Sequence, residues 1–185
     1  ALEPYFIALA VDGEGAIYLA DRNLPGIWKQ SDGKTSIYYR ASKKFKAPLN
    51  AVRSLAFDKD GALLAGDSAT REVYRFVDDE PQPLTGGTIG IPMGIAIDKA
   101  GQIFVTDLES HQVKRIDEAS KKAIKVADVP APVGICIDAQ DQMWVVSRSA
   151  KGQVVRVQQD GTTEAKFPNR PFKFPHNLAV GADGS

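Results

Sequence analysis

The chain of 185 residues is 43% hydrophobic, carries 23 Lys plus Arg against 23 Asp plus Glu, and contains 16 Gly and 11 Pro. The balanced charge gives no support to nucleic-acid or membrane-surface binding, no apolar stretch is long enough to span a membrane, and a single cysteine excludes an intrachain disulfide. We therefore expect a soluble, turn-rich all-β protein without a recognisable signal peptide, whose compartment is unknown.

One short motif of apolar residues that ends in Asp recurs along the chain. It reads Leu9–Asp12, Leu55–Asp58, Ile95–Asp98 and Ile135–Asp138, and Leu178–Gly181 opens it again. The closing positions lie 46, 40, 40 and 43 residues apart. A period of about forty residues made of short strands indicates stacked supersecondary units rather than one ordinary domain.

Each repeat predicts four antiparallel strands. Gly15, Gly61 and Gly101 stand three residues after the Asp, and Asp141 takes that place in the fourth repeat. Asp-x-x-Gly is hairpin chemistry, because the carboxylate accepts backbone amide hydrogens and the glycine supplies a positive φ. The first two strands are apolar nearly throughout, the third ends in Lys or Arg, and the fourth is more polar. Burial that falls from the first strand to the fourth is typical of a β-propeller blade.

The third repeat carries a family resemblance. The segments 91–98, 101–107 and 110–113 read IPMGIAID, GQIFVTD and SHQV, and they resemble an NHL repeat. The wider relatives are the six-bladed propellers of the senescence-marker-protein, gluconolactonase and strictosidine-synthase-like group. The resemblance implies a fold, but this architecture hosts lactonases, lyases and pure binding platforms, so it implies no single function.

We accordingly predict one partial β-propeller over residues 1–185, with four NHL-like blades and the first strand of a fifth. The repeats are expected at about 7–50, 51–90, 91–130, 131–174 and, incomplete, 175–185. The resemblance implies a parent ring of six blades, so we expect a fragment of a longer chain or a ring that other chains complete. Open flanks would expose apolar strand faces, which predicts self-association or pairing with the missing blades.

In propellers of this group, the turn that enters each innermost strand lies at the mouth of the central channel. The resemblance places five side chains at this position: Ile7, Arg53, Met93, Val133 and His176. Arg53 stands where other repeats carry apolar residues, which favours either a ligand or a salt bridge with a loop carboxylate. Asn177 follows His176. The candidate ligand-binding residues at the mouth are therefore Arg53, Met93, His176 and Asn177.

The mouth positions are poor in metal ligands. None is a carboxylate, whereas a hard cation needs several oxygen ligands. The turn Pro175–Leu178 is similar to the turns whose histidines hold zinc in peptide-amidating lyases of propeller fold, and zinc takes three or four ligands. His176 is the one candidate, and its alternative role is to tie the turn by hydrogen bonds. We predict no cofactor and no metal site in this chain, and a divalent metal would need residues from missing blades.

Other conspicuous residues fit structural roles. One polar position follows the second strand of each repeat, and its residues are Asp21, Asp67, Asp107 and Ser147. Recurrence in every repeat favours a hydrogen-bonding role at the second hairpin over a catalytic ring. We expect His111 to bond to Asp107 or to backbone, and the basic run 43–46 to be a solvated connector. Core packing explains Trp28, Trp144 and Cys136.

Two functions follow from these residues. The first expected function is a binding scaffold that takes a small anionic ligand, a peptide or a protein at the channel mouth. Alternatively, it belongs to a metal-dependent hydrolase or lyase of the gluconolactonase or amidating-lyase type, with an incomplete site in this chain. The sequence leaves open whether the protein is an enzyme.

Overall fold

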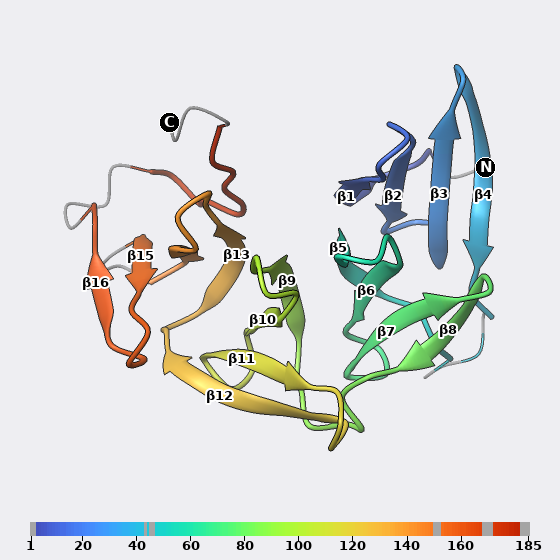
Figure 1. Ribbon diagram of the computed structural model, residues 1–185. Coiled ribbons are helices and arrows are strands. Elements are labelled where there is room, and N and C mark those ends of the chain that lie inside the picture. Colours follow the sequence, from blue (N-terminus) through green and yellow to red (C-terminus); the bar gives the residue numbers. More distant parts are fainter. Residues whose placement is uncertain (1–2, 43, 45–46, 150–152, 168–171, 182–185) are drawn as a thin grey trace. The chain divides into compact units, whose positions relative to one another are not determined.

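Four antiparallel sheets, each of four strands, make up the computed structural model, which describes residues 3–42, 44, 47–149, 153–167 and 172–181 (Figure 1). The all-β prediction is confirmed, since these residues contain strands and no helix. In each sheet the strands pair in chain order, from the first to the fourth. Each sheet is thus one blade of a β-propeller. Of the basic run 43–46, only Lys44 lies within the described residues.

The chain divides into two compact units, residues 1–92 and 93–185. In the first unit, blade one contains β1 (Phe6–Val11), β2 (Ile17–Asp21), β3 (Gly26–Ser31) and β4 (Lys34–Arg40), and blade two contains β5 (Val52–Phe57), β6 (Leu63–Asp67), β7 (Glu72–Val77) and β8 (Glu80–Pro83). In the second unit, blade three contains β9 (Pro92–Ile97), β10 (Ile103–Asp107), β11 (Gln112–Asp117) and β12 (Lys122–Asp128), and blade four contains β13 (Pro132–Ile137), β14 (Met143–Ser147), β15 (Val154–Val157) and β16 (Thr163–Ala165). Pro92, the first residue of β9, is the last residue of the first unit.

The first hairpin of each blade forms as its sequence predicts. Oδ1 of Asp12 accepts hydrogen bonds from the amides of Glu14 and Ala16, at 3.0 and 2.8 Å, and Gly15 follows with a φ of 88°. Blade four repeats the arrangement with Asp141 in the place of the glycine, at a φ of 58°. Asp tolerates this left-handed conformation better than most residues, which explains why the exchange keeps the turn.

The second hairpin confirms the hydrogen-bonding role of the recurrent polar position. Asp67 is fully buried, and its carboxylate accepts hydrogen bonds from the amides of Leu49, Ala51 and Ala69, at 3.0, 2.8 and 3.1 Å. The equivalent Asp107 accepts a 2.8 Å bond from Lys114 Nζ. These carboxylates hold the loops together, because a buried charge must be neutralised by donors around it.

Three other structural expectations have mixed outcomes. His111 bonds to backbone, since its Nδ1 accepts from the amide of Ala131 at 3.0 Å. Trp28 and Trp144 are only half-buried, and each indole donates to a carboxylate rather than filling the core. Cys136 is half-buried, and burial raises the pKa of its thiol to about 11. Such a thiol is a weak nucleophile at neutral pH.

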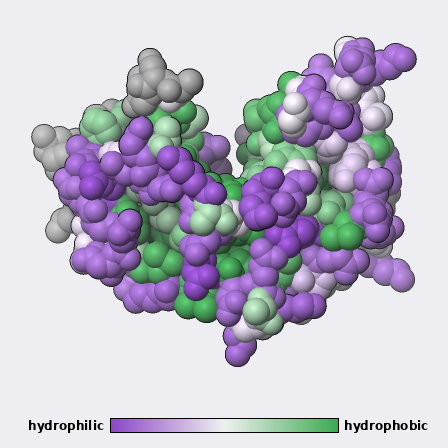
Figure 2. All heavy atoms as spheres, viewed as in Figure 1, coloured by the Kyte–Doolittle hydropathy of each residue, from purple (hydrophilic) through white to green (hydrophobic). Residues whose placement is uncertain are grey.

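Burial falls from the inner strands to the outer ones, with one exception. Every residue of β6 and β10 is buried, whereas every residue of β16 is exposed. The exception is β1, where Leu9 and Val11 are 62% and 51% exposed. The expectation that burial falls from the first strand to the fourth is therefore wrong for the first strand of blade one. The space-filling view shows hydrophilic side chains over much of the visible surface of both units, with hydrophobic ones between them (Figure 2).

The predicted opening strand of a fifth blade is present only as a segment without strand structure. Residues 174–181 form no ladder among the described residues. Their backbone nevertheless lies against β13, because a Cβ on Gly134 would stand 2.7 Å from the Cα of Asn177. The described part of this segment therefore packs on β13 without pairing in a ladder.

Candidate functional site

Each blade has two ends. We call the end at which its first strand begins the mouth end, and the end with the Asp-x-x-Gly turn the far end. The predicted site residues all belong to mouth ends: Arg53 lies on β5 in the first unit, and Met93 lies on β9 in the second. His176 and Asn177 belong to the segment that lies against β13.

In the first unit, a serine holds the side chain of Arg53. Arg53 is half-buried, and its Nε donates to Ser68 Oγ at 3.1 Å, while Ser68 Oγ donates to the carbonyl of Ala51 at 3.1 Å. A salt bridge with a loop carboxylate was one of the two roles predicted for Arg53, but no ion pair joins Arg53 to a residue that the structure describes. A guanidinium carries five N–H donors, so the serine leaves most of them to an external acceptor.

The neighbouring mouth residues of the first unit are structural. Ile7 and Ala8 of β1 are half-buried and apolar. Ser54 is 4% exposed, and its Oγ donates to the carbonyl of Pro92 at 3.1 Å. Its partner on β6 is Gly66, where a Cβ would stand 2.3 Å from Ser54 Oγ. The glycine therefore makes room for the serine hydroxyl.

The second unit has an equivalent hydroxyl-to-carbonyl contact, but here the glycine lies on the first strand of the blade and the hydroxyl residue on the second. Thr106 on β10 donates its hydroxyl to the carbonyl of Val133 at 2.5 Å, and Gly94 on β9 supplies the space. A Cβ on Gly94 would stand 2.7 Å from that carbonyl oxygen. Sequence reasoning missed these hydroxyls. The signal that could have found them is a small hydroxyl residue and a glycine at the same two register positions of successive repeats, in opposite order.

The remaining mouth residues of the second unit differ in exposure, and Val133 is fully buried. Met93 is half-buried, and His176 and Asn177 are exposed. The side chain of Asn177 accepts a hydrogen bond from the amide of Leu178 at 2.9 Å. Among the described residues, no three His, Cys, Asp or Glu side chains come together as a metal ion would require. The same residues include no helix that could cross a bilayer.

Comparison with known proteins supports the fold. No family model matches the chain, and no curated protein does. Among solved structures, virginiamycin B lyase from Staphylococcus aureus is similar at 19% identity over 94% of this chain and 59% of that chain, with a TM-score of 0.73. A catalytically inactive histidine-to-alanine variant of that lyase, with quinupristin, gives 18% identity over 96% of this chain and 60% of that one, with a TM-score of 0.74.

A gluconolactonase from Xanthomonas campestris is similar at 19% identity over 95% of this chain and 65% of that chain, with a TM-score of 0.75. The chain thus spans about three fifths of the length of the first solved structures that it matches. At these identities the likeness concerns the fold alone. The structural neighbours of this chain are β-propellers of the gluconolactonase and virginiamycin B lyase type, and the chain has their all-β propeller fold with four blades and part of a fifth.

Proposed function

We propose that this chain is a ligand-binding propeller module in which Arg53 anchors a small anionic ligand, or the acidic part of a peptide, at the mouth end of the first unit. The proposal rests on the hydrogen bonding of the Arg53 guanidinium. Its Nε is fixed by Ser68, and no other hydrogen bond joins its guanidinium to a described residue. A guanidinium held in one orientation matches the two oxygens of a carboxylate or phosphate.

The mouth residues of the second unit form a separate candidate contact surface of that unit. There, Met93 offers an apolar contact, and the exposed side chains of His176 and Asn177 offer polar ones. None of these residues recurs at the same position in other repeats, so the repeat pattern does not require them. Unrepeated side chains on a repeated frame are where a propeller gains selectivity, because the frame itself is satisfied without them.

Calorimetric titration of succinate, inorganic phosphate and an acidic hexapeptide tests this function. We expect at least one of them to bind the wild type, with about ten-fold or greater loss in Arg53→Met and a smaller loss in Arg53→Lys. Arg40→Met is the matched control, because Arg40 is exposed on β4, the fourth strand of blade one, whereas Arg53 lies on a first strand. Equal affinity of the wild type and Arg53→Met for all three probes contradicts the proposal.

An enzyme remains the second candidate function, favoured by the fact that the similar solved structures include a lyase and a gluconolactonase. In that case His176 would hold a divalent metal or carry a proton. Titration with zinc, calcium and manganese separates the two candidates, and the binding module predicts no tight site. A stoichiometric, sub-micromolar site that is lost in His176→Ala would support the enzyme instead.

A further inference from the structure

A cavity of about 390 Å³ opens at the far end of blades three and four, within the second unit. Its apolar wall consists of Phe104, Val126, Ile137, Met143 and Val157. Small-molecule sites in proteins typically occupy 300–1,000 Å³ and combine an apolar wall with a few polar groups. The cavity lies at the opposite end of β9 and β13 from Met93 and Gly134, so it is separate from the mouth residues.

Comparison with the first unit explains why this space is open. There, a row of four rings runs between blades one and two: Phe57 packs on Tyr18 at a centroid distance of 5.1 Å, Tyr18 on Tyr38 at 5.0 Å, and Tyr38 on Phe76 at 5.2 Å. The strand registers match these rings to residues of the second unit. Phe57 corresponds to Ile137, Tyr18 to Phe104, Tyr38 to Val126 and Phe76 to Val157.

The correspondence follows from the ladders. Ile27 and Val113 are equivalent, because each stands fifteen residues after the Asp of its repeat. Ile27 pairs with Tyr39, and Val113 pairs with Ala127. The residues before these two partners, Tyr38 and Val126, are therefore equivalent as well. All four residues of the second unit's row line the cavity. The second unit therefore keeps one ring of four, and the cavity lies where the other three rings would be.

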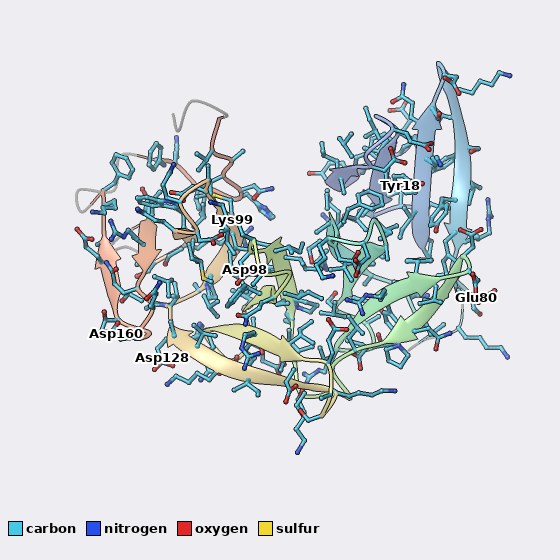
Figure 3. All side chains as sticks on the ribbon, in the orientation of Figure 1. Tyr18, Glu80, Asp98, Lys99, Asp128 and Asp160 are labelled. Carbon is cyan, nitrogen blue, oxygen red and sulfur yellow. The ribbon has the colours of Figure 1, made fainter. Side chains whose placement is uncertain are left out.

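The rim of the cavity offers both donors and acceptors. Arg115 is half-buried, and no side-chain hydrogen bond or ion pair joins its guanidinium to another described residue, whereas Arg75, its counterpart in blade two, forms an ion pair with Asp58 at 2.8 Å. Asp98 and Asp141 add carboxylates, and Gln158 adds an amide. Figure 3 shows Asp98 beside Lys99 in the turn of blade three, and the amide of Lys99 donates to Asp141 at 3.1 Å.

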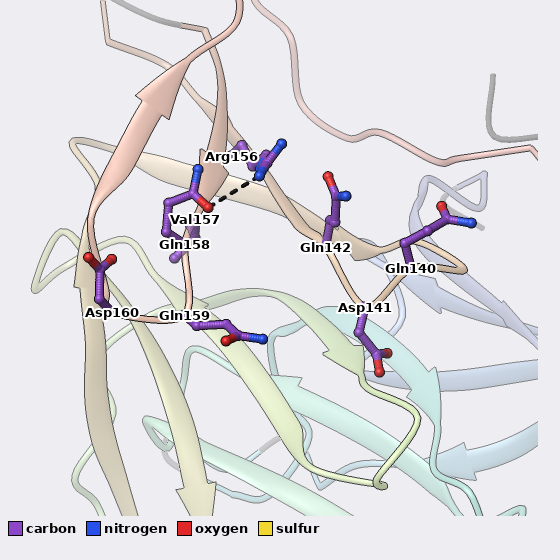
Figure 4. Close-up of a pocket in the computed structure, with 8 residues that line it drawn as sticks. All are labelled: Gln140, Asp141, Gln142, Arg156, Val157, Gln158, Gln159 and Asp160. Carbon is purple, nitrogen blue, oxygen red and sulfur yellow. Dashed lines mark hydrogen bonds between the residues drawn. The ribbon is translucent and has the colours of Figure 1, made fainter.

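A second, more open hollow of about 590 Å³ adjoins the cavity between the turns of blade four. It shares Asp141, Val157, Gln158 and Gln159 with the first cavity. Arg156 and Gln158 point toward each other there, joined by a 3.3 Å hydrogen bond, and Gln159 extends toward the hairpin that carries Asp141 (Figure 4). The apolar cavity thus continues into a polar vestibule lined largely by amides.

We propose that the cavity at the far end of blades three and four binds a flat, uncharged heteroaromatic molecule of one or two fused rings. The space where the first unit has three rings determines the shape of the ligand, and Phe104 is an aromatic residue on which it can stack. The rim fixes the polarity. An anion would meet Asp98 and Asp141, and a cation would meet Arg115, whereas a neutral ring with both donors and acceptors bonds to either kind of group.

Indole, benzimidazole and adenine are the probes, measured by calorimetry and by amide chemical shifts of the whole chain. Benzoate and cyclohexanol serve as the charged and the non-planar comparison. We expect at least one neutral heteroaromatic to bind more tightly than both comparison compounds and to shift the amides of Phe104 and Val126. The filling variants Val126→Tyr and Val157→Phe restore rings found in the first unit, and each should weaken binding at least ten-fold.

Thermal melting of each variant distinguishes a filled cavity from a damaged fold. If Val126→Tyr melts below the wild type, binding is compared between the wild type and Val157→Phe. Val77→Phe is the matched control, because Val77 is 48% exposed on β7 of the other unit. Arg53→Met should leave binding unchanged, which separates this site from the mouth. Tighter binding of benzoate or cyclohexanol, no binding of the neutral probes, or unchanged affinity in a folded filling variant overturns the proposal.

Discussion

Between blades one and two, a continuous row of four aromatic rings fills the first unit, while the same register of the second unit holds one ring and three aliphatic side chains. The hairpins of the two units are nevertheless built alike, from a carboxylate that accepts amide hydrogens and a residue at positive φ. The comparison teaches that turn chemistry defines the repeat, whereas the side chains between blades vary independently. A hollow can therefore form in one pair of blades without loss of the blade itself.

The largest effect is expected from removing a ring of the first unit. Phe76 is 5% exposed and contacts the rings of Tyr38 and Tyr39. Phe76→Ala should lower the free energy of unfolding by about 3–5 kcal/mol, because it loses both burial and packing. Urea unfolding followed by circular dichroism measures this, with Val77→Ala, at an exposed position, expected to change stability by less than about 0.5 kcal/mol. A loss below about 1 kcal/mol in Phe76→Ala would show that the ring row does not stabilise the unit.

The second prediction concerns the shared hairpins. Gly61 and Gly101 occupy the same turn position in the two units, with φ values of 81° and 84°. Gly61→Val and Gly101→Val should each destabilise by roughly 1–3 kcal/mol, because a β-branched residue is strained at positive φ. The two losses should agree, since the turns are alike although the interiors differ. Melting temperatures measured side by side check this, and an unchanged value for either variant would refute the turn assignment.

The third prediction concerns the exposed face of β1. Leu9 is 62% exposed, whereas its equivalents Leu55, Ile95 and Ile135 are 8%, 8% and 6% exposed. An apolar strand face whose equivalents are all buried favours association with a sheet of the same kind, and a second copy carries such sheets. We predict self-association in the micromolar range, weakened about ten-fold by Leu9→Lys. Sedimentation equilibrium measures it, with Val77→Lys as control, and a strictly monomeric wild type would exclude it.

The smallest effect concerns acid. Burial alone would raise the pKa of Asp21 and of Asp138, but amide donors and the indoles of Trp28 and Trp144 outweigh it and hold both pKa values below the usual range. A carboxyl whose pKa is lower in the folded state stabilises the fold above its unfolded pKa, and this contribution is lost as the pH falls through the folded value. Stability should therefore drop below about pH 4.

Trp144→Phe removes one of these donors, so the loss of stability between about pH 5 and pH 3 should be smaller in this variant than in the wild type. Trp28→Phe provides the matching change in the first unit. Thermal melting across this pH range measures both. An identical acid dependence in the wild type and the two variants would mean that the indoles do not hold these carboxylates ionised.

The mouth residues illustrate how far the sequence reaches into the candidate site. The repeat register singled out Arg53 because the other three complete repeats carry Ile, Met and Val at its position. Its partner could not be read from the sequence, since Ser68 is brought to it by the hairpin of β5 and β6 rather than by proximity along the chain. The Ser54 and Thr106 hydroxyls escaped notice for a related reason, because their acceptors are carbonyls on distant segments and a carbonyl has no sequence signature.

The sequence by itself determined the strands, the turns and the blade, because these depend on local chemistry that recurs with the period of the repeat: Asp and Gly at fixed spacing, and apolar residues between them. Tertiary structure alone decided which faces were covered. Leu9 and Leu55 have the same place in the repeat and opposite exposure, and Val126 lines a cavity where Tyr38 fills its own. Burial and cavity volume depend on the side chains that meet across two sheets, and those side chains lie far apart in the sequence.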